Sequence, residues 1–171
     1  MTATLRTFAG KTPEIGRGVY LAETCSVIGD VVIGEDSSIW YGTVVRGDVM
    51  PIRIGARTSI QDNAVIHVTD GFSGTIIGSD CTVGHSAIIH ACTVEDFCLI
   101  GMGSIILDGA RIGRGSLVGA GALVTPGTDI PPGSLVVGSP AKVKRPINEK
   151  EREQIAYGAQ HYVDLARQYR A

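Results

Sequence analysis

The chain has 171 residues, of which 44% are hydrophobic, and its formal net charge is −2. This length fits one domain with its own core, and the apolar content excludes a disordered chain. A near-neutral charge provides no basic face, so we expect no nucleic-acid partner. No stretch is apolar enough for a signal peptide or a membrane span, so we expect a cytoplasmic protein without membrane contact.

Glycine and cysteine usage narrow the class further. The 23 glycines are about twice the usual share, whereas aromatic residues make up only 5%, and this combination indicates a narrow, regular core. The four cysteines form no CxxC pair. In a chain without an export signal, that spacing favours reduced, buried thiols over disulfides.

Aliphatic residues recur with a period of six across residues 27–139. The first position of every unit is Val or Ile, and the fifth is almost always Ser, Thr, Ala or Cys. The first positions are Val27, Ile33, Ile39, Val45, Ile54, Ile60, Ile66, Ile77, Val83, Ile89, Val94, Ile100, Ile106, Ile112, Val118, Val124, Ile130 and Val136. Such a period is typical of a parallel β-helix in which each unit supplies one short strand and one corner.

Three units close one triangular coil, so the repeat predicts about six coils stacked about 4.8 Å apart. The pattern resembles that of the left-handed hexapeptide-repeat β-helix, an all-β fold. The alternative, a β-sandwich of alternating strands, does not account for one register kept over a hundred residues.

The period breaks at three places, and it ends before the C-terminus. Extra residues lie between Val45 and Ile54 and between Ile66 and Ile77, and one residue is missing between Ile89 and Val94. We expect residues 68–74 to form a surface loop.

The C-terminal segment predicts a helix. We expect a β-helix domain over residues 1–146 and a helix within 147–171, capped by Asn148 and Glu151. Its apolar stripe would pack on a prism through Ile155, Ala159, Tyr162, Val163, Ala166 and Tyr169.

Three of the four histidines lie within 24 residues. Counted on the repeat, His67 and His90 are each the second residue of a unit, three units apart, which is one whole coil. We therefore expect them to stack on one face, about 4.8 Å apart in the backbone. His85 is the third residue of an intervening unit and lies on a different face.

A lone outward histidine is usually a solvated surface residue, but three in register predict a metal site. Three imidazoles suit a tetrahedral Zn²⁺ with water as the fourth ligand, and they also accept Fe²⁺ or Co²⁺. Because His85 lies around a corner from His67 and His90, we expect the ligands to meet between the subunits of a homotrimer.

Arg46 continues the column of His67 and His90, since it lies three units before His67. Asp48, two residues later, is placed to orient the Arg46 guanidinium. We consider two roles for these residues, a structural network at the subunit interface and a contribution to catalysis.

A second column contains His85, with Asp62 one coil below it and Gln61 beside Asp62. Asp62 could pair with an arginine across the seam between subunits. We consider the same two roles for it, a structural one at the interface and a contribution to catalysis. Gln61 is uncharged and is suited to hydrogen-bonding a water on the metal.

At these segments the sequence is similar to the γ-class carbonic anhydrases. The resemblance is carried by IWYGTVVRGD at 39–48, IQDNAVIH at 60–67 and VGHSAIIH at 83–90, with GMGS at 101–104 and GSPAK at 138–142. It implies a homotrimer with three interfacial zinc sites, each with His67 and His90 from one subunit and His85 from the next. It also implies that Gln61 positions a zinc-bound hydroxide, while Arg46, Asp48 and Asp62 hold the interface.

The chain departs from the best-characterised type of that family in two places. That type has a glutamate directly after the Arg-Gly-Asp segment and another in an acidic loop, for proton transfer. Here Val49 occupies the first position, and the 68–76 loop has only Asp70. The chain therefore resembles the shorter branch of the family. Without those glutamates, a proton released in CO₂ hydration would leave this chain through buffer or through a helix tyrosine such as Tyr162.

Three functions follow from these observations. The first is a carbonic anhydrase-like lyase that hydrates CO₂ reversibly to bicarbonate, with a zinc-bound hydroxide as nucleophile. The second is an acyltransferase with one histidine as general base, which needs no metal and leaves two histidines unexplained. The third is a metal-binding trimer without turnover. Metal analysis distinguishes the second from the others, and a CO₂-hydration assay distinguishes the first from the third.

Overall fold

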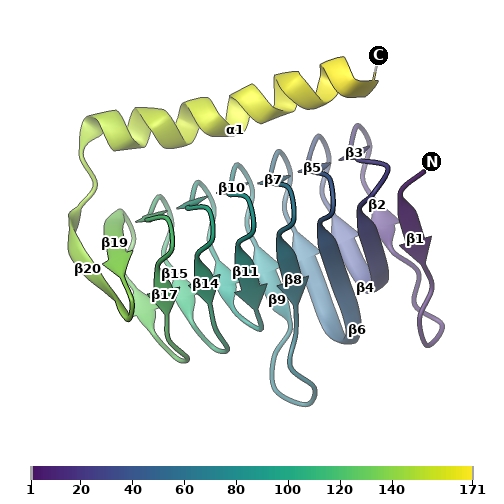
Figure 1. Cartoon of the computed structure of the whole chain (residues 1–171), viewed down its shortest axis with the longest axis horizontal. Helices are drawn as coiled ribbons and strands as arrows, with labels where there is room; N and C mark the ends of the chain where they lie inside the picture. Colours follow the sequence, from purple (N-terminus) through teal and green to yellow (C-terminus); the bar gives the residue numbers. More distant parts are fainter. Residues whose placement is uncertain (1, 171) are drawn as a thin grey trace.

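The computed structural model describes residues 2–170, which form a left-handed parallel β-helix, a prism with three faces. Figure 1 shows its coils stacked in a row and one helix running along the stack. Face 1 of the prism contains β8 (Val65–His67), β11 (Ile88–His90), β14 (Ile105–Ile106) and β17 (Leu123–Val124). Face 2 contains β9 (Thr75–Ile77), β12 (Thr93–Val94), β15 (Arg111–Ile112) and β18 (Asp129–Ile130).

Two long strands and a third face complete the prism. Strands β4 (Ser26–Ile33) and β6 (Val44–Ile54) run around the corner between faces 1 and 2, so these faces form one continuous sheet. Face 3 contains β3 (Tyr20–Leu21), β5 (Ser38–Ile39), β7 (Ser59–Ile60), β10 (Thr82–Val83), β13 (Leu99–Ile100), β16 (Leu117–Val118) and β19 (Ser134–Gly138).

The predicted repeat positions fill the interior. All eighteen first-position residues are buried, with exposed fractions of at most 3%. They stack on one another from coil to coil, as Ile66 does on Ile89 and Val83 on Ile100. The six-residue period therefore sets both the register and the core, as the sequence predicted.

The prism begins one coil earlier than the period indicates. Strands β1 (Thr4–Arg6) and β2 (Glu14–Ile15) pair with the two ends of β4, and β3 pairs with β5. Leu5, Ile15 and Leu21 thereby take the place of first-position residues. The six-residue period does not predict this coil, because Leu5 and Ile15 are ten positions apart and two of its three first-position residues are Leu, not Val or Ile.

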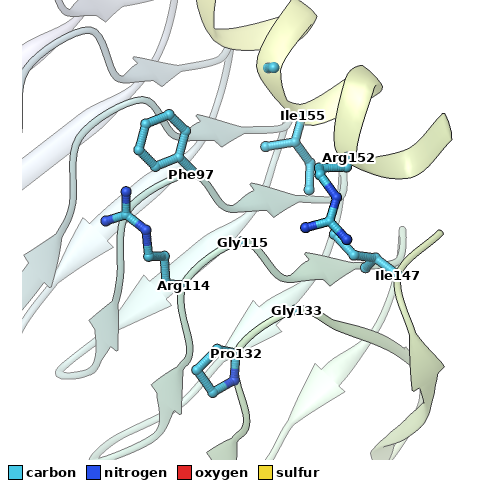
Figure 2. A pocket seen from close by; sticks show the side chains of 9 residues that line it. Phe97, Arg114, Gly115, Pro132, Gly133, Ile147, Arg152 and Ile155 are labelled. Atoms are coloured by element: carbon cyan, nitrogen blue, oxygen red, sulfur yellow. The ribbon is translucent and has the colours of Figure 1, made fainter. Parts of the chain in front are cut away.

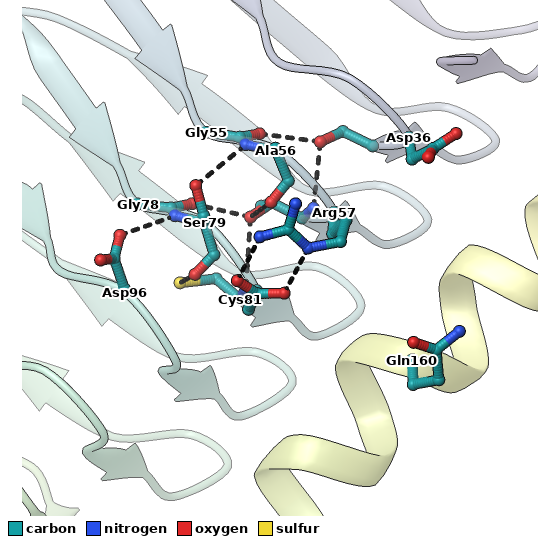
Figure 3. Close-up of polar contacts among 12 residues, drawn as sticks. Asp36, Gly55, Ala56, Arg57, Gly78, Ser79, Cys81, Asp96 and Gln160 are labelled. Atoms are coloured by element: carbon teal, nitrogen blue, oxygen red, sulfur yellow. Dashed lines mark hydrogen bonds and ion pairs between the residues drawn. The ribbon is translucent and has the colours of Figure 1, made fainter.

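A hydrogen-bonded column of small side chains runs along one corner (Figure 3). The hydroxyl of Thr58 donates to the carbonyl of Gly78 and accepts from the backbone N–H of Cys81. The thiol of Cys81 donates to the carbonyl of Glu95 and lies 3.5 Å from the backbone nitrogen of Cys98. Thiols thus take the same structural role as hydroxyls, and all four cysteines are free and buried, as predicted.

The breaks in the period correspond to real features. Opposite Asp30 of β4, strand β6 carries surplus residues, and the register shifts there. Residues 68–74 form the loop that projects between β8 and β9 (Figure 1), with Phe72 62% exposed at its end. These two insertions lie at the corner between faces 1 and 2, next to the column of His67 and His90.

The chain leaves the prism through β20 (Ala141–Pro146), which pairs antiparallel with β19, and continues into α1 (Glu149–Arg170). The predicted cap is present, because Asn148 Oδ1 accepts from Glu151 N–H at 2.9 Å and Glu151 Oε2 accepts from Asn148 N–H at 2.8 Å. The expected division into residues 1–146 and 147–171 stays a prediction, and residues 1 and 171 lie outside the described part.

Helix α1 packs on face 3 of its own prism, against β3, β5, β7 and β10. Four residues of the expected stripe are buried, and Tyr162 and Tyr169 contact the ring of Trp40. Near its first turns the helix stands off the prism above a hollow of about 470 Å³, lined among others by Phe97, Arg114 and Ile155 (Figure 2). Within residues 2–170, no helix is both long enough and apolar enough to span a bilayer.

Candidate metal centre

His67 and His90 lie directly above one another on face 1, as the repeat predicted. They end strands β8 and β11 and are paired in the parallel ladder. Their rings lie 5.1 Å apart between centroids, and Nδ1 of His67 is 3.1 Å from Nε2 of His90. One nitrogen of each imidazole therefore points at the same small region outside the prism.

The other nitrogen of each ring contacts a carboxylate. Nε2 of His67 lies 3.1 Å from Oδ1 of Asp48, and Nδ1 of His90 lies 2.7 Å from Oδ1 of Asp108. Because a carboxylate accepts hydrogen bonds, these contacts favour the tautomers that carry the proton on those nitrogens. In these neutral tautomers the facing nitrogens are both acceptors, and two lone pairs 3.1 Å apart are unfavourable unless a proton or cation lies between them.

The donor set fits Zn²⁺. Two nitrogens bound to one tetrahedral zinc at about 2.0–2.1 Å lie about 3.3 Å from each other, close to the 3.1 Å between His67 Nδ1 and His90 Nε2. Metal-binding imidazoles commonly donate their second N–H to a carboxylate, which fixes the ring and the tautomer. His67 and His90 show both features, the nitrogen spacing and the carboxylate behind each ring.

His85 shows the same carboxylate contact but lies elsewhere in the chain. Its Nδ1 is 2.9 Å from Oδ2 of Asp62, which leaves Nε2 free. His85 precedes β11 and His90 ends it, so the five residue steps from one to the other span up to about 16 Å of extended chain. Within residues 2–170 of one chain, no group of three or more His, Cys, Asp or Glu side chains is arranged to hold a metal ion.

Hydrogen bonds from neighbouring side chains lower the pKa of two of these carboxylates, Asp48 and Asp108. Burial raises the pKa of Asp48, but hydrogen bonds from Arg46 and His67 outweigh it and leave that pKa below its usual value. Hydrogen bonds from Thr69 and then from His90 lower the pKa of Asp108. Arg46 contacts Asp48, as the sequence predicted, and Asp48 in turn contacts His67.

Gln61 and Asp62 lie on the His85 side of the prism. Gln61 is only 5% exposed, and no hydrogen bond joins its side-chain amide to another group of the described residues. It lines a groove of about 630 Å³ between face 3 and α1, and His85 lines the same groove. The predicted residues thus form two sets on one chain, with Arg46, Asp48, His67 and His90 in one and Gln61, Asp62 and His85 in the other.

Two contacts were missed by the sequence reading. Asp108 could have been found from the repeat, since it is the third residue of the unit at Ile106, three units after that of His90. The contact of Asp48 with His67 could not, because it depends on the surplus residues of β6 that change the register at this corner.

Residues 12–47 and 91–126 match the family described as bacterial transferase hexapeptide (six repeats). Over 96% of this chain and 90% of the relative, it is 49% identical to a carbonic anhydrase of Geobacillus kaustophilus. It is 46% identical to the mitochondrial γ carbonic anhydrase 2 of Arabidopsis thaliana, with 95% of this chain aligned, and spans 60% of that protein's length.

A solved structure matches the whole fold. A Bacillus cereus protein, provisionally named an acetyltransferase, superimposes with a TM-score of 0.96 and 42% identity over 99% of this chain and 98% of its own. The high identity to carbonic anhydrases over nearly full length, on this repeat fold, establishes the family. The chain belongs to the γ-class carbonic anhydrase-like family of hexapeptide-repeat proteins.

Proposed function

We propose that this protein is a zinc-dependent carbonic anhydrase that hydrates CO₂ reversibly to bicarbonate at the subunit interfaces of a homotrimer. The proposal rests chiefly on the His67–His90 pair, whose facing nitrogens lie 3.1 Å apart while carboxylates hold the opposite nitrogens. It is supported by the carbonic anhydrases among its relatives.

His85 of a neighbouring subunit would supply the third imidazole. Its ring is already oriented by Asp62, and its side chain is 48% exposed in the single chain, so it is accessible to another subunit. A cyclic trimer repeats one interface three times, and each interface would bring the two sets of residues together once.

Each residue then has a distinct task. A Zn²⁺ ion, when bound, supplies hydroxide at neutral pH, because it lowers the pKa of water to about 7. The carboxylates of Asp48, Asp62 and Asp108 fix the three imidazoles in one tautomer. The buried amide of Gln61 would orient the attacking water or the bicarbonate product, and Arg46 would hold Asp48 in place and neutralise its charge.

The experiment is a CO₂-hydration assay on protein freshly loaded with Zn²⁺, Fe²⁺ or Co²⁺, together with metal analysis. Near one metal ion per chain and a hydration rate above that of the metal-free protein would support the proposal. Full metal without hydration would instead favour a metal-binding trimer without turnover.

Acyl transfer is the second candidate, favoured by the acetyltransferase name of the Bacillus cereus structure and by the volume of the groove at His85, about 630 Å³. It would use one histidine as a general base and no metal. Turnover of a coenzyme A thioester by metal-free protein would establish it in place of hydration.

A further inference from the structure

The groove beside His85 contains titratable side chains that the proposed reaction has not used, and one of them is a histidine. Helix α1 forms one wall of the groove and contributes Tyr157, His161 and Tyr162, and face 3 forms the other with Thr82 and Gly84. His161 is the fourth histidine of the chain, and its side chain is exposed. It therefore faces both the groove and bulk solvent.

Two aromatic rings hold the imidazole of His161. Tyr157, one helical turn earlier, stacks on it with 5.5 Å between ring centroids and 17° between ring planes. The ring of Tyr162 lies edge-on at 5.4 Å. Residues four apart on a helix are neighbours on its surface, so the helix itself fixes the position of His161 at the edge of the groove.

The face 3 wall of the groove carries one buried polar atom without a partner, within the described residues. Thr82 is 7% exposed, and its Oγ1 makes no hydrogen bond within residues 2–170. This hydroxyl faces α1 at Gly158, where a side chain would approach it to 3.2 Å. Buried hydroxyls normally have a partner, so a water in the groove is the expected partner of Thr82, on the same wall as the amide of Gln61.

We propose that His161 is the proton-transfer residue of the site, taking the proton released in CO₂ hydration through water held by Thr82 and passing it to solvent base. The proposal rests on the proposed function. In that reaction CO₂ and H₂O give bicarbonate and one proton. The proton would move along water to a ring nitrogen of His161, and the other nitrogen would release a proton to buffer.

The alternative acceptor on the same helix is Tyr162. Burial, and after it the negative charge of Asp62, raises the pKa of Tyr162. Its hydroxyl therefore keeps its proton at neutral pH. An imidazole has two ring nitrogens, so it can accept a proton at one and release a proton from the other. The other titratable groups around the groove are His85, Glu151 and Tyr157. Of the two imidazoles in the groove, His85 is assigned to the metal, which leaves His161, at the exposed edge, for proton transfer.

The test uses the zinc-loaded trimer and its His161→Ala variant in dilute and concentrated buffer. At low buffer concentration we expect kcat to fall at least tenfold, because a positioned acid–base group typically contributes about 10²–10⁴-fold. We expect kcat/KM and zinc content to stay unchanged. Added imidazole should restore kcat. A matched control is Gln160→Ala, since Gln160 bonds to Asp164 and does not line the groove.

A second variant and a second measurement separate the outcomes. Thr82→Val should lower kcat in the same buffer-dependent way without loss of zinc, and a crystal structure of the loaded trimer should show waters linking His161, Thr82 and the metal. If His161→Ala hydrates CO₂ as fast as wild type in dilute buffer, this proposal alone is overturned. The same holds if the crystal structure shows apolar side chains, and no water, between His161 and Thr82. No hydration by fully loaded wild type overturns the proposed function and this proposal together.

Discussion

The carboxylate of Asp108 lies 2.7 Å from Nδ1 of His90 and also accepts a hydrogen bond at 2.5 Å from the hydroxyl of Thr69, at the base of the 68–74 loop. One acidic residue thus joins the loop inserted after β8 to the imidazole at the end of β11. Its charge also fixes which nitrogen of His90 faces His67.

Asp108→Asn should weaken zinc binding about 10–100-fold, the usual effect of losing a carboxylate behind a metal-binding histidine. The amide no longer favours one tautomer of His90, although it keeps the shape of the side chain. Competition with a chromogenic chelator measures the affinity. Asp129→Asn is the matched control, because Asp129 pairs with Arg111 on face 2. Equal affinities in the two variants would contradict the proposed role.

Gln61→Ala should keep the full metal content and lower the hydration rate. The amide lines the groove beside His85 and is not expected to be a ligand, so its loss removes the group that orients the reacting water. Metal analysis and stopped-flow hydration are run on the same sample. If metal and rate fall together, Gln61 is a structural residue.

The seam between subunits can be tested by mixing two inactive variants. His67→Ala and His85→Ala trimers should each bind zinc poorly. After joint unfolding and refolding, an intact His67–His90 pair from one chain meets an intact His85 from another at one interface of each mixed trimer. Zinc content should then rise.

Mixing His67→Ala with His90→Ala should restore nothing, because those two imidazoles must come from the same chain. Recovery in this second mixture would show that His67 and His90 do not act as a pair. No recovery in the first mixture, once subunit exchange is demonstrated, would place His85 outside the site.

The cap of α1 should make stability depend on acid. Hydrogen bonds, first from Arg145 and then from Asn148, lower the pKa of Glu151 from 4.5 to about 2. A carboxylate whose pKa is lower in the folded state stabilises it above the unfolded value and loses that effect as pH falls. Glu151→Gln should melt below wild type at pH 7, and the gap should close between about pH 4.5 and 2.

The matched control for the cap is Glu153→Gln, on the exposed surface of the same helix. This variant should have the same melting temperature as wild type at pH 7 and at about pH 2. A gap for Glu151→Gln that persists at pH 2 would mean that shape, and not charge, stabilises the cap.

The cysteines in the corner column should tolerate only small replacements. Cys98→Ser keeps a donor toward the carbonyl of Gly113, 3.4 Å away, and should change the free energy of unfolding by about 1 kcal/mol or less. Cys98→Leu overfills the corner and should cost about 1–3 kcal/mol. Urea denaturation of both variants measures this, and a stable Leu variant would show that the corner has spare room.

The fold could be predicted because the residues that determine it repeat at a fixed spacing along the sequence. Each Val or Ile that fills the prism recurs in one register, so His67 and His90 could be placed above one another before any coordinates. The contact of Asp48 with His67 depends on extra residues at a corner, where the period gives no position. The place of His161 depends on how α1 docks on face 3, which an apolar stripe alone does not determine.

The strand that ends the prism also determines how these molecules behave when they are concentrated. Because β20 runs antiparallel to β19, the last parallel edge of face 3 is already occupied. The outer strand carries Lys142, Lys144 and Arg145 and ends at Pro146, and charge and proline on an edge strand oppose the addition of another chain. A solenoid that could otherwise be extended end to end into fibres is thereby closed on this face at its C-terminal end.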